Sequence, residues 1–206
     1  MDSRYRFTHN VIDRFKVVML AAGLMLSTIG STLPALSDEN DRSLESAETT
    51  ALSQLETYLQ AGDWARADAQ TWALTAEVVD VDATGGLITF EHLSCDRLQH
   101  IDQLWRTYSQ DQFGFSVQKN LVAQNGDDPT NLTVKAYRRL ALQTGWKTGT
   151  DQEGSGYRRY RSLDFSDAAP QGQFPASPWG GYNYRREFGP FLGSNQELGQ
   201  RIARCL

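Results

Sequence analysis

The chain has 206 residues, of which 40% are hydrophobic and 22% charged, and its formal net charge is −5. That length is enough for one domain with a single buried core. The acidic balance, without a basic stripe, argues against a nucleic-acid partner.

The first 37 residues have the parts of an export signal. The N-terminal region carries four basic and two acidic side chains, an apolar run occupies 17–26, and Ala35-Leu36-Ser37 supplies the small residues that signal peptidase requires. We therefore predict a signal peptide over 1–37 that is cleaved before Asp38. The protein would then lie in a periplasm, in a thylakoid lumen or outside the cell. The alternative is an uncleaved leader in which residues 17–36 anchor the chain to a membrane, although Gly, Pro and hydroxyl residues make that segment a poor span.

Apolar residues at helical spacing predict a mainly α protein, with a charged linker at 38–49 and one helical domain at 50–206. The first helix ends at Gly62, and Asp63 caps a second helix whose apolar face runs to Val78. Four more helical stretches are predicted at 98–108, 116–122, 132–146 and 194–205.

Residues 147–190 differ from the rest, because they are rich in Gly, Pro and aromatic residues and lack helical spacing. Residues 156–165 alternate enough for a short strand or hairpin. A long irregular segment inside a compact domain is usually functional. Its aromatic rings are interleaved with arginines, a combination that suits a flat apolar ligand bearing carboxylates. The alternative is that these rings form a small second core under a long loop.

Catalytic signatures are missing from the sequence. It has no phosphate-binding glycine-lysine loop, no dinucleotide fingerprint, and no HExxH, GxSxG or CxxC pattern. We therefore predict that the protein is not an enzyme. Its two cysteines, Cys95 and Cys205, could pair in an oxidising compartment or remain two buried thiols, and the sequence leaves both possibilities open.

Residues 80–91 have the spacing of a twelve-residue calcium loop between two helices. The candidate ligands for weak Ca²⁺ binding stand at positions 1, 3, 5, 7 and 12 of this loop, namely Asp80, Asp82, Thr84, Gly86 and Glu91. Thr84 replaces the usual carboxylate or amide, and Ile88 offers no side-chain oxygen. The simpler alternative is a glycine turn whose aspartates are solvated.

Three motifs occur in order along the chain: Gly62-Asp63-Trp64 with Ala67-Asp68, Ile101-Asp102 with Leu104-Trp105, and Phe113-Gly114-Phe115-Ser116-Val117-Gln118. Together with "LDFSDAAPQGQFP" at 163–175 they resemble the genomes-uncoupled-four family, the tetrapyrrole-binding regulators of magnesium chelatase in oxygenic phototrophs. The resemblance covers about residues 50–206. It implies an all-helical domain, shaped like a cupped hand, that holds protoporphyrin IX or Mg-protoporphyrin in an apolar cleft.

The resemblance also suggests which residues bind the pigment. The macrocycle would contact Trp105, Phe113, Phe115, Phe165, Phe174 and Trp179, and its propionates would pair with Arg158, Arg185 and Arg186. For Phe113 and Phe115, ordinary core packing is the alternative.

Two features depart from the family. The family's loop usually carries His-Leu where this chain has Gln173-Phe174, which removes an imidazole. The export signal is the second departure, because an exported protein would not meet magnesium chelatase. The expected function is therefore non-enzymatic tetrapyrrole binding in a photosynthetic bacterium. The alternative is a scaffold domain that kept the fold and lost the pigment.

Overall fold

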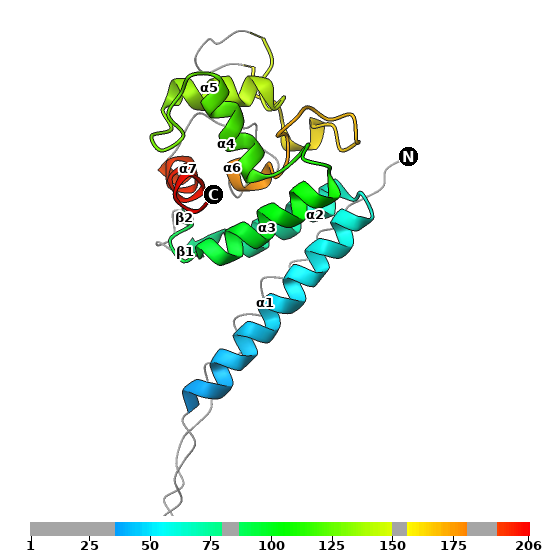
Figure 1. The fold of residues 1–206 in the computed structure, drawn as a ribbon, viewed down its shortest axis with the longest axis vertical. Coiled ribbons are helices and arrows are strands. Elements are labelled where there is room, and N and C mark those ends of the chain that lie inside the picture. Colours follow the sequence, from blue (N-terminus) through cyan, green and yellow to red (C-terminus); the bar gives the residue numbers. More distant parts are fainter. Residues whose placement is uncertain (1–35, 80–86, 150–155, 181–192) are drawn as a thin grey trace, which may run out of the picture. The chain divides into compact units, whose positions relative to one another are not determined.

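The computed structural model of the protein describes residues 36–79, 87–149, 156–180 and 193–206, and Glu39–Leu206 form one compact unit. This part of the chain is mainly helical, as predicted (Figure 1). The elements in chain order are α1 (Leu36–Gln60), α2 (Trp64–Thr75), β1 (Glu77–Val79), β2 (Leu87–Thr89), α3 (Cys95–Tyr108), α4 (Phe115–Gln124), α5 (Val134–Gln143), the 3-10 turn η3 (Tyr160–Ser162), α6 (Ser177–Gly180) and α7 (Gly193–Cys205).

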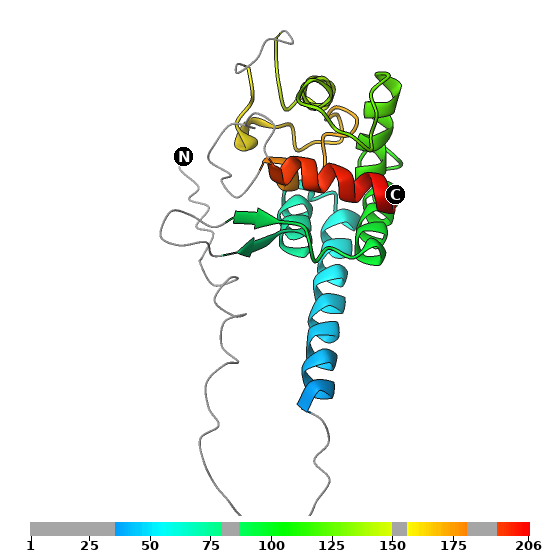
Figure 2. The same cartoon turned by 90° about the vertical axis from the view of Figure 1, so that its left-hand side faces the viewer.

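Helix α1 begins before the predicted domain boundary. Residues 38–49, predicted to be a linker, are helical. This stretch contains neither Gly nor Pro, so nothing in it interrupts a helix. Leu55 and Leu59 are buried in the core, whereas Glu45 is exposed. Figures 1 and 2 show the C-terminal half of α1 beside α2 and α3, with its first turns away from them.

After α2 the chain forms a β-hairpin, which corrects one prediction. The apolar face was expected to continue helically to Val78. Instead α2 ends at Thr75, and β1 pairs antiparallel with β2, with Val78 opposite Ile88. Branched side chains at these positions favour extended backbone. The Glu197 carboxylate of α7 accepts the N–H of Phe90 at 3.0 Å and attaches the end of the hairpin to that helix.

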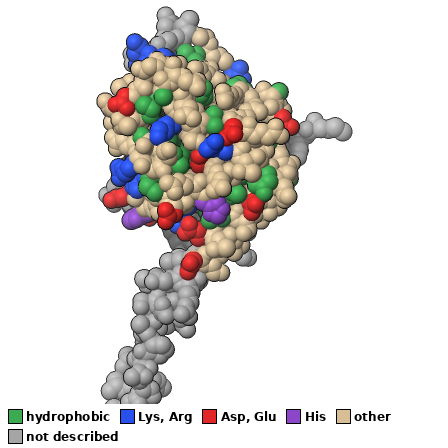
Figure 3. All heavy atoms as spheres, viewed as in Figure 1, with side chains coloured by type: hydrophobic (Ala, Val, Ile, Leu, Met, Phe, Trp, Pro, Cys, Tyr) green, Lys and Arg blue, Asp and Glu red, His purple; other side chains and the backbone are tan. Residues whose placement is uncertain are grey.

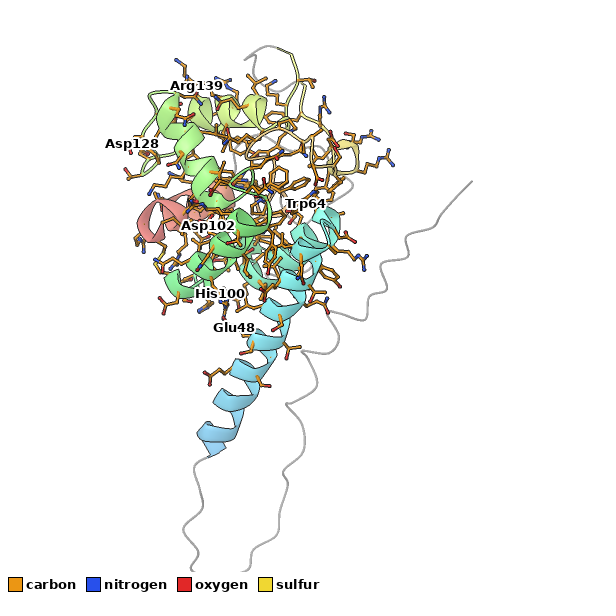
Figure 4. All side chains as sticks on the ribbon, turned by 45° about the vertical axis from the view of Figure 1, so that its right-hand side comes forward. Glu48, Trp64, His100, Asp102, Asp128 and Arg139 are labelled. Atoms are coloured by element: carbon orange, nitrogen blue, oxygen red, sulfur yellow. A yellow bond between two sulfur atoms is a disulfide. The ribbon has the colours of Figure 1, made fainter. Side chains whose placement is uncertain are left out.

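The Phe113-Gly114-Phe115 turn joins α3 to α4. Both phenylalanine rings are fully buried, and Gly114 has a φ of +139°. A Cβ at Gly114 would lie 2.9 Å from Oδ1 of Asp102, so glycine is needed for α3 to lie this close to the turn. The same Oδ1 accepts the backbone N–H of Ser116 at 2.8 Å and caps the first turn of α4 (Asp102 is labelled in Figure 4).

A disulfide links the first residue of α3, Cys95, to the last residue of α7, Cys205. The sequence left this pairing open. The side-chain amide of Gln99 also donates to the carbonyl oxygen of Cys205 at 2.7 Å. Helix α7 is therefore joined to α3 by a covalent bond and by a hydrogen bond.

Aromatic side chains dominate the interior. The indole N–H of Trp105 donates to Oγ1 of Thr71 at 2.9 Å, and that of Trp146 donates to the carbonyl oxygen of Gln173 at 2.9 Å. These polar atoms are satisfied in the interior, as burial requires. The largest fully buried rings are Trp105, Trp146, Tyr137, Phe90, Phe113, Phe115 and Phe174.

On the face shown in Figure 3, hydrophobic side chains form small groups separated by charged ones. Val134 is exposed to 41% and is the only large hydrophobic side chain so exposed among the residues whose side chains the structure describes. None of the helices in those ranges is long and apolar enough to cross a membrane.

Candidate functional site: an aromatic and arginine face

Asp68 lies on the buried side of α2 and accepts hydrogen bonds from both ends of segment 160–177. Its Oδ1 accepts the backbone N–H of Ala176 at 2.6 Å. Its Oδ2 accepts the N–H of Ser177 at 3.0 Å and the hydroxyl of Tyr160 at 2.6 Å. Burial raises the pKa of Asp68 to about 6, and the hydrogen bonds partly oppose this rise. One carboxylate thus holds two pieces of chain that lack a sheet or long helix of their own.

A series of contacting rings runs from the surface into the core. Tyr160 meets Phe165 edge to face at 5.5 Å between ring centroids, and Phe165 stacks on Phe174 at 5.2 Å. Phe174 in turn contacts Phe113 at 5.2 Å and Trp105 at 6.0 Å. Tyr160 and Phe165 are partly exposed, whereas the other three rings are fully buried. The surface rings therefore rest on a rigid aromatic interior.

Three arginines lie next to Tyr160 in the sequence, at the exposed end of this ring series. Arg158, Arg159 and Arg161 are all exposed, and none forms an ion pair within the part of the chain that the structure describes. Arg159 stands at the N-cap of the η3 turn, and Arg161 lies within it. We call Arg158, Arg159, Tyr160, Arg161 and Phe165 the aromatic–arginine face. Unpaired guanidinium groups beside aromatic rings can bind an anionic aromatic molecule.

Most of the rings expected to touch a macrocycle lie in the core. Five of the six are buried, and only Phe165 is partly exposed. Trp179 is 3% exposed, and its indole N–H donates to Oε1 of Gln118 at 2.8 Å. The physical reason is that large rings contribute most when buried, and an irregular segment gives no periodicity to show which rings face inward. The five buried rings are Trp105, Phe113, Phe115, Phe174 and Trp179.

The predicted arginines fall into two groups. Arg158 is exposed on the aromatic–arginine face. Arg185 and Arg186 lie outside the described residues. A cavity against Trp179, between α4, α5 and α7, has a volume of about 20 Å³, which is room for one water rather than a macrocycle.

Sequence reasoning missed Asp68 and Tyr160 as members of this site. Asp68 stands in the motif that begins at Gly62, four residues after buried Trp64 and three before buried Thr71. An acidic residue on the apolar side of a helix must have hydrogen-bond donors around it. That spacing was the available signal, although it could not identify Tyr160 as a donor.

Of the predicted calcium ligands, only Glu91 lies within the described residues. Asp80, Asp82, Thr84 and Gly86 lie outside the described residues. Glu91 is exposed, and its carbonyl oxygen accepts a hydrogen bond from Arg201 at 2.7 Å. Within the described ranges, no three His, Cys, Asp or Glu side chains are grouped so as to hold a metal ion.

The helical fold and the aromatic–arginine face define a small helical domain with a surface suited to an anionic aromatic ligand. The sequence pattern of the GUN4-like family matches residues 45–187, which is more than half of the chain. The protein belongs to the GUN4-like family.

Solved structures of this family are similar to the chain. GUN4 from Chlamydomonas reinhardtii is 23% identical, with a TM-score of 0.45, over 73% of this chain and 84% of that one. The ligand-free structure of GUN4 from Arabidopsis thaliana is 20% identical, with a TM-score of 0.44, over 73% of this chain and 87% of that one. No curated protein sequence matches the chain.

Proposed function

We propose that this protein binds a porphyrin-type tetrapyrrole, protoporphyrin IX or Mg-protoporphyrin, on its aromatic–arginine face and outside the cytoplasm. It acts by binding alone and catalyses no reaction. Membership of the GUN4-like family supports the ligand class. The observation that carries the proposal is the set of three exposed arginines without ion pairs in the described chain, beside partly exposed rings, on a protein of net charge −5.

The chemistry of this face matches the two parts of a porphyrin. The Phe165 ring, backed by buried Phe174, offers a flat apolar surface against which a macrocycle can stack. Arginine guanidinium groups pair with carboxylates in a two-point geometry, as porphyrin propionates allow.

The disulfide supports the proposed location. Disulfides persist in exported proteins and are rare in the cytosol. Cys95–Cys205 is therefore expected to form after export, in keeping with the leader over residues 1–37. An exported protein does not meet magnesium chelatase, so we do not expect that enzyme to be its partner. Expression with the leader in a bacterial host should yield a protein that begins at Asp38, and recovery of cytosolic protein that begins at Met1 would contradict the location.

Binding is tested by titrating the purified protein with protoporphyrin IX and Mg-protoporphyrin while following tryptophan quenching. We expect saturation with a Kd below about 10 μM, equivalent to about 7 kcal/mol. The paired substitution Arg159→Gln and Arg161→Gln should weaken binding roughly ten-fold, because two exposed ion pairs contribute about 1–2 kcal/mol together. The matched control is Arg66→Gln, which removes an exposed arginine on α2 that pairs with Asp63.

The esterified ligand provides a second control. Protoporphyrin dimethyl ester lacks the carboxylates, so it should bind the wild type and the arginine variant equally. Absence of saturable quenching by either porphyrin would favour the second candidate function, a protein-interaction scaffold. The observation that favours the scaffold is the burial of Trp105, Phe113, Phe115, Phe174 and Trp179 in the core, which leaves few rings for a pigment.

A further inference from the structure

Asp68 joins two parts of the chain that are distant in sequence. Tyr160 lies 92 positions away, and Ser177 lies 109 positions away. The Ser177 hydroxyl also donates to the carbonyl oxygen of Asp68 at 2.8 Å, so the backbone of α2 takes part as well. Asp68 therefore holds the beginning and the end of segment 160–177 at a single point.

The middle of that segment is held by other residues. The indole N–H of Trp64 donates to Oδ1 of Asp167 at 2.9 Å (Trp64 is labelled in Figure 4). The amide of Gln112 donates to the carbonyl oxygen of Ala169 at 2.6 Å. Removing the Asp68 contacts would therefore leave residues 164–175 attached and affect mainly Tyr160 and the start of α6.

The orientation of Tyr160 determines how the aromatic–arginine face is displayed. Its hydroxyl donates inward to Asp68, and its ring lies against Phe165. Arg159 and Arg161 immediately flank Tyr160 in the η3 turn, and both are exposed. With Tyr160 pinned inward, the backbone of this turn is fixed and both guanidinium groups are directed to solvent.

We propose that Asp68 is the positioning residue of the aromatic–arginine face: its carboxylate fixes Tyr160 and thereby presents Arg159 and Arg161 to the carboxylates of the ligand. This inference rests on the proposed function, since it concerns the same face. Asp68 itself does not contact the ligand, because its side chain is completely buried. Asp68 favours binding by preorganising the face, which reduces the free-energy cost of ordering it when a ligand binds.

The test uses Tyr160→Phe, which removes the hydroxyl and keeps the ring. The matched control is Tyr108→Phe, because the Tyr108 hydroxyl also donates to a carboxylate, Oε1 of Glu56, at 2.7 Å. Neither α1 nor α3, which carry that pair, contributes a residue to the face. We expect Tyr160→Phe to weaken protoporphyrin IX binding roughly ten-fold and to change the induced circular dichroism of the bound porphyrin. The control should leave the affinity and the spectrum as in the wild type.

Amide hydrogen exchange supplies a readout that needs no ligand. The N–H of Ser162 donates to the carbonyl oxygen of Arg159 at 2.8 Å, and that of Leu163 donates to the carbonyl oxygen of Tyr160 at 3.1 Å. Both amides should exchange faster in Tyr160→Phe and in Asp68→Asn, while amides of α3 and α4 keep their wild-type rates.

The outcomes separate the two proposals. If wild-type protein does not bind the porphyrin, the proposed function fails, and exchange at Ser162 and Leu163 still decides whether Asp68 positions the turn. If the wild type binds and Tyr160→Phe binds equally well with unchanged exchange at both amides, the positioning role is overturned. Equal weakening by Tyr160→Phe and Tyr108→Phe would also overturn it, because the effect would then be general destabilisation.

Discussion

Breaking the disulfide should destabilise the protein by several kcal/mol without changing its folded structure. Cys95 and Cys205 are 110 positions apart in the chain. In the chain-entropy account, a cross-link across a loop of that length stabilises the folded state by about 5 kcal/mol, because it restricts the unfolded chain. The folded state retains other bonds between α7 and its neighbours, from Gln99 to Cys205 and from Phe90 to Glu197. The loss should therefore act mainly through the unfolded state.

Urea unfolding followed by tryptophan fluorescence measures this loss directly. Reduction with dithiothreitol should lower the unfolding midpoint by roughly 2 M urea for a domain of this size. The double variant Cys95→Ser and Cys205→Ser is the control, since it should unfold like the reduced wild type and show no response to dithiothreitol. Superimposed curves for oxidised and reduced wild type would refute the chain-entropy reasoning.

Three other predictions concern Asp68, Trp179 and the candidate calcium loop. Burial raises the pKa of Asp68 from 3.8 to about 6, so protonation of this carboxyl stabilises the folded state. This contribution to the unfolding free energy is complete below about pH 4 and is lost as the pH rises through 6. The unfolding free energy of the wild type relative to Asp68→Asn should thus fall by about 3 kcal/mol between pH 4 and pH 8, and a rise would show that the hydrogen bonds outweigh burial. Trp179→Ala should lower the unfolding free energy in urea by about 3–5 kcal/mol, whereas a ring on the ligand-binding surface would leave it nearly unchanged. If residues 80–91 bind calcium, millimolar calcium should raise the Tm of the wild type and leave the Tm of Glu91→Gln unchanged. Equal melting curves of the wild type with calcium and with chelator would contradict calcium binding and favour a simple glycine turn.

The helical elements could be predicted because their apolar spacing is a local property of the sequence. Asp63 accepts the N–H of Arg66, as a capping residue should, and the buried residues of α2 include the expected Trp64 and Leu74. The hairpin was missed because Val78 fits the apolar face of a helix as well as a strand, and because Ile88 lies in a stretch with the spacing of a calcium loop. The pairing of β1 with β2 makes these residues strands, and the spacing of apolar residues within one segment does not report a contact between two segments.

The sequence could not show which aromatic rings are exposed, because exposure in an irregular segment depends on distant contacts. Phe165 and Phe174 stand in the same stretch and look alike in the sequence. Phe165 is partly exposed, whereas Phe174 is buried between Phe113 and Trp105. What distinguishes the two rings is the position of α3, and no local pattern reports it.

Side chains of the helical motifs determine the shape of the irregular segment. In the first motif, Asp68 binds the start of η3 and the start of α6. In the last motif, the amide of Gln118 donates to the carbonyl oxygens of Gly172 at 2.9 Å and Pro175 at 2.8 Å. In a β-sheet the backbone itself would supply such hydrogen bonds, whereas here buried carboxylate and amide side chains supply them.

This arrangement has a consequence for binding. A surface on a loop without such bonds must be ordered when the ligand arrives, which costs affinity. Here Asp68 and Gln118 hold the segment through hydrogen bonds within the fold, so much of the free-energy cost of ordering it is met during folding rather than during binding. Substitutions at these buried groups should therefore affect ligand affinity and unfolding free energy together, whereas substitutions of the exposed arginines should affect affinity alone.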